Sequence, residues 1–224
     1  MLRRCSDREV PALGSLDAVV FDMDGVLLDS SPIHAAAYLE ALGAFPIPSF
    51  QYSRLAGLRT TDGIRQILSE NGIALAEEQI DSIAAVKSKI ALERMIRENP
   101  IAPGARGVLE SLSRRHKLAL ASSGSAASVN AFLDCNGLRS FFECVLHSGD
   151  IVSAKPSPEI FLAAFQRLGI PPEKCAVVED AVAGIQAARA AGGVVFGIPA
   201  TCAARDLEQA GADFIIESLE DLLK

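Results

Sequence analysis

Several residue types and patterns are scarce in this sequence. Its five cysteines are odd in number, and no two of them form a Cys-x-x-Cys pair. With only three histidines as well, the chain has no evident set of ligands for a zinc site. Free thiols are typical of a reducing compartment, so we expect a cytoplasmic protein.

Long apolar runs and an excess of basic residues are lacking too. No apolar stretch approaches the length of a membrane span, which argues against a membrane partner. The formal net charge is −7, whereas proteins that bind nucleic acid electrostatically normally carry a basic surface. The segment MLRRCSDREVPALGS has no continuous apolar stretch and does not resemble a secretory signal. We expect residues 1–15 to form a flexible arm.

Short apolar runs alternate with helical patterns along most of the chain. Of the 224 residues, 50% are hydrophobic, which is enough for one sizeable core with a smaller companion domain. Continuous apolar runs between helices are typical of parallel strands covered on both faces. We therefore predict an α/β fold with a Rossmann-like parallel sheet. The expected strands are AVVF (18–21), LALAS (118–122), AVVED (176–180), VVFGI (194–198), DFIIES (213–218) and, more weakly, ECVLHSGD (143–150), and the expected helices between them cover 105–116, 126–137, 158–169 and 181–193.

One long interval breaks this alternation. No convincing strand occurs between AVVF and LALAS, and a single loop of that length is implausible inside a compact domain. The interval instead shows helical patterns and ends in the breaker-rich segment NPIAPG. We predict an all-helical cap domain over residues 32–98, inserted into an α/β core formed by residues 16–31 and 99–224. Its expected helices cover 32–42, 61–70 and 77–98.

Two acidic residues follow the first expected strand. Asp22 and Asp24 come directly after AVVF, and burying two carboxylates without a partner is costly. A hard divalent cation such as Mg²⁺ would remove their repulsion, because it takes carboxylates, waters and a substrate phosphate as ligands. An aspartate beside Mg²⁺ and a phosphoryl group can also act as a nucleophile.

The same edge of the predicted sheet should gather further polar groups, because ligands of open α/β sheets bind at the carboxyl ends of the strands. Ser122 ends LALAS, Asp180 ends AVVED, and Lys155 precedes a predicted helix. Ser122 and the backbone N–H groups of residues 122–124 could hold phosphate oxygens, and Lys155 could neutralise phosphate charge. Each feature alone is common in turns and at helix starts, so the prediction depends on their joint occurrence.

Four motifs in this order resemble those of the haloacid dehalogenase superfamily. They are DMDGVLLDS (22–30), ASS (121–123), KPSPEIF (155–161) and VVEDAVAGI (177–185). The resemblance covers nearly the whole chain after residue 15 and extends to the capped branch that contains β-phosphoglucomutase and many sugar-phosphate phosphatases. It implies a Mg²⁺-dependent phosphatase that hydrolyses a small phosphorylated metabolite through an aspartyl-phosphate intermediate. A sugar phosphate, a polyol phosphate or a phosphoglycolate-like compound would fit.

The resemblance also implies roles for the acidic residues. Asp22 matches the nucleophile, and Asp24 matches the general acid/base whose backbone carbonyl ligates the metal. Asp22 and Asp180 match metal ligands. Glu179 matches a residue that ligates the metal directly in some members and acts behind the ligands in others.

The remaining matches concern the phosphate and the cap. Ser122 and Ser123 match the phosphate-binding motif, and Lys155 matches the lysine that balances its charge. His34 lies where the mutase-like members carry a histidine near the catalytic aspartate, although a histidine in HAAAYLE also fits an exposed helix surface. Arg59, in the loop AGLRTTDG, could contact an anionic or hydroxylated part of the substrate or lie in solvent.

Two alternatives remain. A phosphomutase of the same branch returns the phosphoryl group to a sugar, and such members carry a lysine just before the cap-loop glycine and an arginine three residues after it. Counted from Gly57, those positions are Ala56 and Thr60, so hydrolysis is preferred unless Arg59 supplies the charge. A phospho-receiver domain also uses Asp, Lys and Mg²⁺, but it has its acceptor on a middle strand and no cap. The sequence leaves the substrate and the oligomeric state open.

Overall fold

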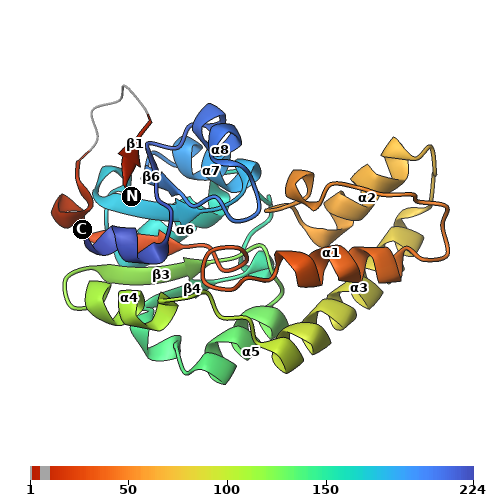
Figure 1. Ribbon diagram of the computed structural model, residues 1–224, viewed down its shortest axis with the longest axis horizontal. Coiled ribbons are helices and arrows are strands. Elements are labelled where there is room, and N and C mark those ends of the chain that lie inside the picture. The colour runs from red at the N-terminus through yellow and green to blue at the C-terminus, as the bar shows by residue number, and fades with distance from the viewer. Residues whose placement is uncertain (1, 6–10) are drawn as a thin grey trace.

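The computed structural model describes residues 2–5 and 11–224, and its centre is a seven-stranded sheet. The strand order is β1-β7-β6-β5-β2-β3-β4, and every neighbouring pair is parallel except β1 with β7 (Figure 1). The strands are β1 (Arg3–Arg4), β2 (Ala18–Phe21), β3 (Lys117–Ala121), β4 (Cys144–Leu146), β5 (Cys175–Glu179), β6 (Val194–Gly197) and β7 (Phe214–Ile215). The predicted α/β fold with a parallel sheet is confirmed.

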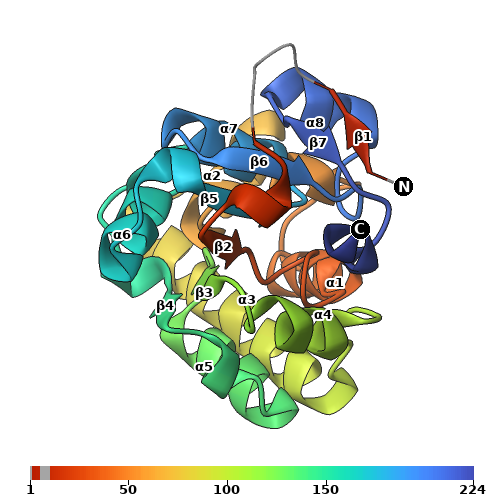
Figure 2. The same cartoon turned by 90° about the vertical axis from the view of Figure 1, so that its left-hand side faces the viewer.

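Helices cover both faces of this sheet. They are α4 (Ala105–Leu112), α5 (Ala126–Asn136), α6 (Glu159–Leu168), α7 (Val182–Ala190) and α8 (Ala204–Ala210). Side chains of a strand point alternately to the two faces, so Val19 and Phe21 pack with α4 and α5, whereas Ala18 and Val20 pack with α6 and α7 (Figure 2). All four residues of β2 are buried, which explains why the sequence shows a continuous apolar run there.

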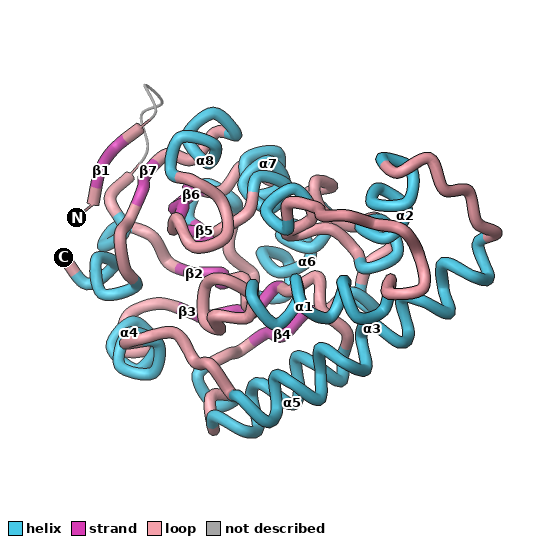
Figure 3. The backbone as a smooth tube through the Cα atoms, turned by 45° about the vertical axis from the view of Figure 1, so that its right-hand side comes forward, coloured by secondary structure: helices cyan, strands magenta, loops and turns pink. Residues whose placement is uncertain are grey.

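The predicted helical insertion is present between β2 and β3. It contains α1 (Ser31–Ala41), α2 (Thr60–Glu70) and α3 (Glu77–Glu98), and α1 packs along α3 (Figure 3). We call these helices and their connecting loops the cap. The cap has an apolar cluster of its own, which includes Ile64, Ile67 and Ile80. At its two ends, Ile33 of α1 and Met95 of α3 pack instead into the cluster between the sheet and α4–α5, so both connections are anchored on the core.

The N-terminal segment and the last strand form short elements. Within the segment expected to be a flexible arm, Arg3–Arg4 forms the edge strand β1 along β7, and Leu13–Ser15 forms a 3-10 turn. Residues 1 and 6–10 of that expected arm lie outside the described residues. The strand expected at 213–218 shortens to β7, and α8 is absent from the expected elements because its seven residues give too short a pattern. Within the described ranges, we find no helix with the length and apolar character that crossing a membrane requires.

Candidate active site

The carboxyl ends of three neighbouring strands bring the expected polar residues together. Asp22 directly follows β2, Ser122 directly follows β3, and Glu179 ends β5 with Asp180 next in the chain. Since β2 lies between β3 and β5 in the sheet, these residues share one edge. All four are buried, as is Lys155, which reaches them from the loop before α6.

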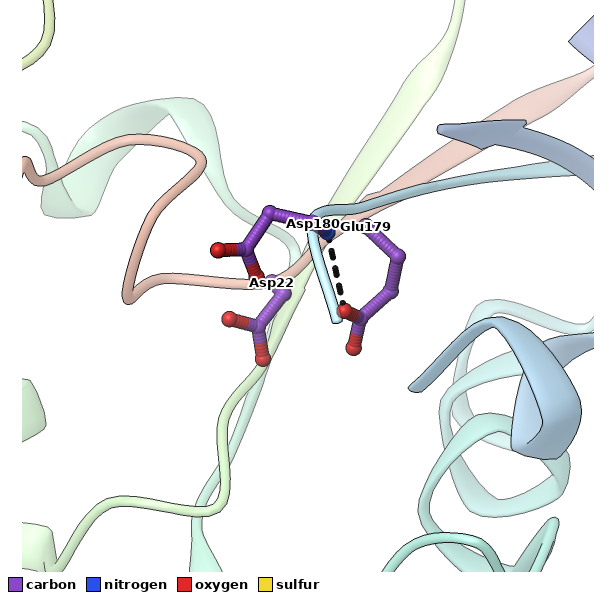
Figure 4. A group of neighbouring side chains, drawn as sticks. All are labelled: Asp22, Glu179 and Asp180. Carbon is purple, nitrogen blue, oxygen red and sulfur yellow. Dashed lines mark hydrogen bonds between the residues drawn. The ribbon is translucent and has the colours of Figure 1, made fainter. Parts of the chain in front are cut away.

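Asp22, Glu179 and Asp180 form a compact carboxylate cluster (Figure 4). One oxygen of each lies within 4.8 Å of the others. The Oε2 atom of Glu179 accepts hydrogen bonds from the backbone N–H groups of Asp180 at 3.1 Å and Ala181 at 3.3 Å. In contrast, Oδ2 of Asp180 is buried and has no hydrogen-bond partner among the described residues.

An unpartnered buried carboxylate oxygen is unfavourable, and oxygen donors in such a cluster suit a hard divalent cation. Gly25 makes room at the same point. A Cβ atom at this position would lie 1.8 Å from Oδ2 of Asp180, and the residue has a φ of +80°. The residues therefore fit a divalent metal, and glycine is required where the backbone passes this close to the carboxylate.

The buried ammonium of Lys155 neutralises part of the negative charge of the carboxylate cluster. Its Nζ atom donates hydrogen bonds to Oδ1 of Asp22 at 2.6 Å, to Oε1 of Glu179 at 2.6 Å and to the carbonyl oxygen of Ala121 at 3.2 Å. It also lies 4.9 Å from the centre of the Phe161 ring. Burial lowers the pKa of this ammonium, but the Asp22 and Glu179 carboxylates outweigh that effect and raise the pKa. Lys155 is therefore charged.

Burial is the main cause of a raised pKa in two of the carboxylates. It raises the pKa of Asp22 to about 8, with further upward contributions from Glu179 and Asp24 and a downward one from Lys155. The pKa of Asp180 is raised well above its usual value by burial and then by the charges of Glu179 and Asp22. A divalent cation would relieve this repulsion, because opposite charge favours the ionised form.

Asp24 is held by residues at the start of the cap. Ser30 donates a hydrogen bond to its Oδ1 atom at 2.5 Å, and Nε2 of His34 lies 2.9 Å from the same oxygen. Nδ1 of His34 in turn lies 3.0 Å from Nζ of Lys87. A carboxylate only accepts and an ammonium only donates, so neutral His34 with its proton on Nε2 satisfies both contacts. Burial raises the pKa of Asp24, but His34, Ser30 and Lys87 together lower it below its usual value.

Lys87 is a site residue that the sequence analysis missed. It lies on α3 at helical spacing from Ile80, Ala84 and Ala91, and all four side chains are buried. A lysine on the apolar face of a helix is the signal that could have identified it. Its ammonium also lies 4.4 Å from the centre of the Tyr38 ring. Burial lowers the pKa of Lys87 to about 8.

We expect Lys87→Met to stabilise the fold at neutral pH. The folded protein binds the lysine proton less tightly than the unfolded chain, whose lysine keeps a pKa near 10.5. The charged form is therefore penalised below pH 8, and the penalty fades as the pH rises from about 8 to 10.5. The gain should be on the order of 2 kcal/mol at pH 7 and should shrink over that range, as measured by chemical denaturation. Lys89→Met on the exposed face of α3 is the matched control, and an equal effect of both substitutions would contradict the prediction.

Two cavities meet at Asp24. The inner cavity has a volume of about 60 Å³, and its lining includes Asp22, Asp24, His34, Tyr52 and Ser123. The outer cavity has a volume of about 480 Å³ and lies between the cap and the core. Its lining shares Asp24, His34 and Ser123 with the inner one and adds hydroxyl groups of the cap and of the start of α5. The geometry thus provides a small polar chamber beside the carboxylates and a larger compartment leading to it.

The three remaining predicted site residues, Ser122, Ser123 and Arg59, lie in different environments. Ser122 is fully buried and accepts a hydrogen bond from the N–H group of Gly124 at 3.0 Å. The hydroxyl of Ser123 donates to the carbonyl oxygen of Gly57 in the cap at 2.8 Å. Arg59 lines only the outer cavity, where its Nη2 atom donates to the carbonyl oxygen of Ile151 at 2.9 Å. Ser123 and Arg59 therefore link the cap to the core in this geometry.

Comparisons with known proteins agree in sequence and in structure. Residues 16–192 match the family model of haloacid dehalogenase-like hydrolases. A phosphorylated carbohydrates phosphatase of Thermotoga maritima is 32% identical over 180 residues, which cover 79% of this chain and 82% of the relative. The fructose-1-phosphate phosphatase YqaB of Escherichia coli is 33% identical over 175 residues, which cover 78% of this chain and 92% of the relative. The crystal structure of β-phosphoglucomutase from Clostridium difficile has a TM-score of 0.81 at 27% identity, covering 92% of this chain and 93% of that chain.

Proposed function

Because the chain belongs to the haloacid dehalogenase-like hydrolase family, we propose that this phosphatase hydrolyses phosphate monoesters of small sugars or polyols with the help of a bound Mg²⁺ ion. The observation that carries the proposal is the buried cluster of Asp22, Glu179 and Asp180, with its unpartnered carboxylate oxygen beside a small polar chamber. Such a cluster is costly to the fold and is expected where it serves a metal and a phosphoryl group.

The proposed reaction has two steps. Asp22 attacks the phosphorus atom of the substrate, the ester bond breaks, and Asp24 gives a proton to the departing oxygen. Asp24 then takes a proton from a water molecule, which attacks the phosphorus of phospho-Asp22 and releases inorganic phosphate. The Nε2–H group of His34 donates a hydrogen bond to Oδ1 of Asp24 and so orients this carboxyl group, which regains its proton from water in the second step.

Other residues hold the charges in place. Asp22, Asp180 and the backbone carbonyl of Asp24 would hold the metal, with Glu179 as a direct ligand or behind them. When bound, the cation supplies charge stabilisation to the phosphoryl oxygens. Lys155 neutralises part of the charge of Asp22 and Glu179 through its hydrogen bonds.

Phosphate oxygens are proposed to bind at the end of β3. The hydroxyl of Ser122 and the backbone N–H group of Ser123 are the proposed donors, because the N–H groups of Ser122 and Gly124 already donate to Leu146 and to Ser122. Ser123 lies on the lining of both cavities, so phosphate held there would be within the chamber that Asp22 and Asp24 line.

The outer cavity supports a hydroxylated leaving group. Its lining combines the guanidinium of Arg59 with serine and threonine hydroxyls of the cap and the core, namely Thr60, Thr61, Ser88, Ser123, Ser125, Ser128 and Ser148. Hydroxyls donate and accept hydrogen bonds, so this lining suits a polyol or sugar. The Thermotoga maritima and Escherichia coli relatives are phosphatases of phosphorylated carbohydrates and of fructose 1-phosphate by their names, which supports this class.

The cap is proposed to exclude water during the reaction. We assign residues 32–98 to this cap domain and residues 16–31 and 99–224 to the core. The hydrogen bonds from Ser123 to Gly57 and from Arg59 to Ile151 hold the cap on the core, which would shield phospho-Asp22 from bulk water.

Phosphomutase activity is the second candidate, and the similarity to the solved β-phosphoglucomutase favours it. A mutase must hold a second, distal phosphate, for which positive charge in the cap is needed. Ala56 and Thr60 are uncharged, and one donor of Arg59 already binds the carbonyl oxygen of Ile151. Lys87, the other cap cation on these cavities, lies 3.0 Å from Nδ1 of His34 and is engaged there. Each charge-assisted hydrogen bond contributes ~1.5–3 kcal/mol, so Arg59 alone would hold the distal phosphate less tightly than two cations. These features favour hydrolysis.

We expect phosphate release from a panel of sugar and polyol phosphates in the presence of Mg²⁺. EDTA should reduce the release to background, because the carboxylate cluster then lacks its counter-charge, and added Mg²⁺ should restore it. Phosphate release assayed against each compound measures this. Full activity in metal-free buffer would contradict the mechanism. In a further arm with β-glucose 1-phosphate, Mg²⁺ and a catalytic amount of the 1,6-bisphosphate, efficient formation of glucose 6-phosphate would show a mutase instead.

A further inference from the structure

The chain has no tryptophan and two tyrosines, and both tyrosines lie in the cap beside the inner cavity. Tyr38, on α1, is buried, and the centre of its ring lies 4.4 Å from Nζ of Lys87. Tyr52 begins a 3-10 turn at Tyr52–Arg54. Its ring lies parallel to the His34 ring within 15°, with 6.1 Å between the ring centres. The ring of Tyr52 is therefore placed by the same histidine that holds Asp24.

Tyr52 lines the inner cavity together with the carboxylates of Asp22 and Asp24. Among the described residues, no side chain or carbonyl accepts a hydrogen bond from its hydroxyl. Burial raises its pKa well above the usual value, and the charges of Asp24, Asp180 and Asp22 raise it further. Tyr52 is thus a neutral phenol and an unused donor within the field of three carboxylates.

We propose that the Tyr52 hydroxyl donates a hydrogen bond to the phosphoryl group as it is transferred, which makes Tyr52 a catalytic residue supplied by the cap. The inference rests on the proposed phosphatase function. An incoming phosphoryl group places new oxygen acceptors in the chamber that Tyr52 lines, where its hydroxyl makes no hydrogen bond to a described residue. Because the phenol is neutral, it adds no charge to the site and needs no counter-ion. Because Tyr52 belongs to the cap, its contribution exists only while the cap covers the core, which couples closure to chemistry.

The first test is Tyr52→Phe, which removes the hydroxyl and keeps the ring against His34. A hydrogen bond to a charged group contributes ~1.5–3 kcal/mol, so we expect kcat for an aryl phosphate to fall by roughly 10- to 100-fold. KM should change far less, since the contact strengthens in the transition state. Thermal unfolding should match that of the unmodified protein. An unchanged kcat, or a raised KM with unchanged kcat, would overturn the proposal.

The second test detects hydrogen bonding by the Tyr52 hydroxyl through the near-ultraviolet absorbance of tyrosine. Without tryptophan, the near-ultraviolet band above the phenylalanine region comes from Tyr38 and Tyr52 alone. Tyr38→Phe therefore isolates Tyr52. Inorganic phosphate added to this variant with Mg²⁺ should shift the tyrosine band to longer wavelength, as hydrogen-bond donation by a phenol does. The Tyr52→Phe variant, which keeps only Tyr38, should show no comparable shift.

The outcomes distinguish failure of the proposed phosphatase function from failure of the proposed role of Tyr52. If the unmodified protein released phosphate from no compound of the panel, the proposed function would fail. If the protein were an active phosphatase and Tyr52→Phe matched it in kcat, only the role of Tyr52 would fail. Absence of a phosphate-dependent shift in Tyr38→Phe, under conditions where phosphate inhibits the enzyme, would also overturn that role.

Discussion

Asp22→Asn is expected to abolish phosphate release while leaving the chain folded. The amide cannot form the acyl-phosphate bond, so turnover should fall by roughly 10⁴- to 10⁶-fold, the range typical of removing a catalytic nucleophile. The amide oxygen can still accept the hydrogen bond that Lys155 now donates to Oδ1 at 2.6 Å. Phosphate release under single-turnover and steady-state conditions measures the effect. Near-normal turnover of this variant would contradict the covalent route.

The stability of the same variant provides an independent check. Burial raises the pKa of Asp22 to about 8, so the metal-free folded protein loses stability as the pH rises from about 4, where the unfolded carboxyl ionises, to 8. The amide that replaces this carboxyl does not ionise. The thermal midpoint of metal-free Asp22→Asn should therefore exceed that of the unmodified protein at pH 8, and the difference should shrink towards pH 4.

Asp24→Asn is the matched comparison for activity. It removes proton transfer but keeps the backbone carbonyl, so we expect a smaller loss of about 10²- to 10⁴-fold. Its hydrogen bonds with Ser30 and His34 can be retained by the amide oxygen. A loss equal to that of Asp22→Asn under all conditions would remove the distinction between nucleophile and proton donor.

The placement of the main site residues follows from chain direction alone. Asp22, Ser122 and Asp180 follow apolar runs, and parallel strands necessarily end at the same edge of the sheet. The helical insertion follows from the missing strands and from helical spacing. The edge strand β1 has two residues, which is too short for any periodic pattern, and its pairing with β7 depends on contacts between the two ends of the chain.

Other parts of the site depend on tertiary contacts. Lys87 becomes a site residue only because α1 and α3 pack together and bring His34 to 3.0 Å from it. Tyr52 lies outside any periodic pattern, so its stacking on His34 has no local signal. The direction of Arg59 is fixed by the carbonyl of Ile151, which is far away in sequence. Sequence patterns show which elements form, whereas these contacts depend on how the cap sits on the core.

Lys155→Met is expected to cause the largest loss of stability. It keeps an apolar side chain of similar length but removes the ammonium that binds Asp22 and Glu179 and lies 4.9 Å from the centre of the Phe161 ring. Three carboxylates would then lie within 4.8 Å of one another without their buried cation. Breaking a buried ion pair by removing one partner costs ~3–5 kcal/mol, and we expect a loss of this size in metal-free buffer at pH 7–8.

Because the carboxylate cluster is negatively charged, the loss of stability in Lys155→Met should depend on pH and on Mg²⁺. The raised pKa values of Asp22 and Asp180 mean that both take up protons as the pH falls, so repulsion and the difference from the unmodified protein should shrink in acid. Saturating Mg²⁺ should also recover part of the loss, because the cation supplies charge to the same carboxylates. Lys89→Met makes the same chemical change at an exposed site on α3, where an effect within about 0.5 kcal/mol is expected. Chemical denaturation of both variants measures the difference, and a Lys155→Met variant as stable as Lys89→Met would mean that the cluster does not need its buried cation.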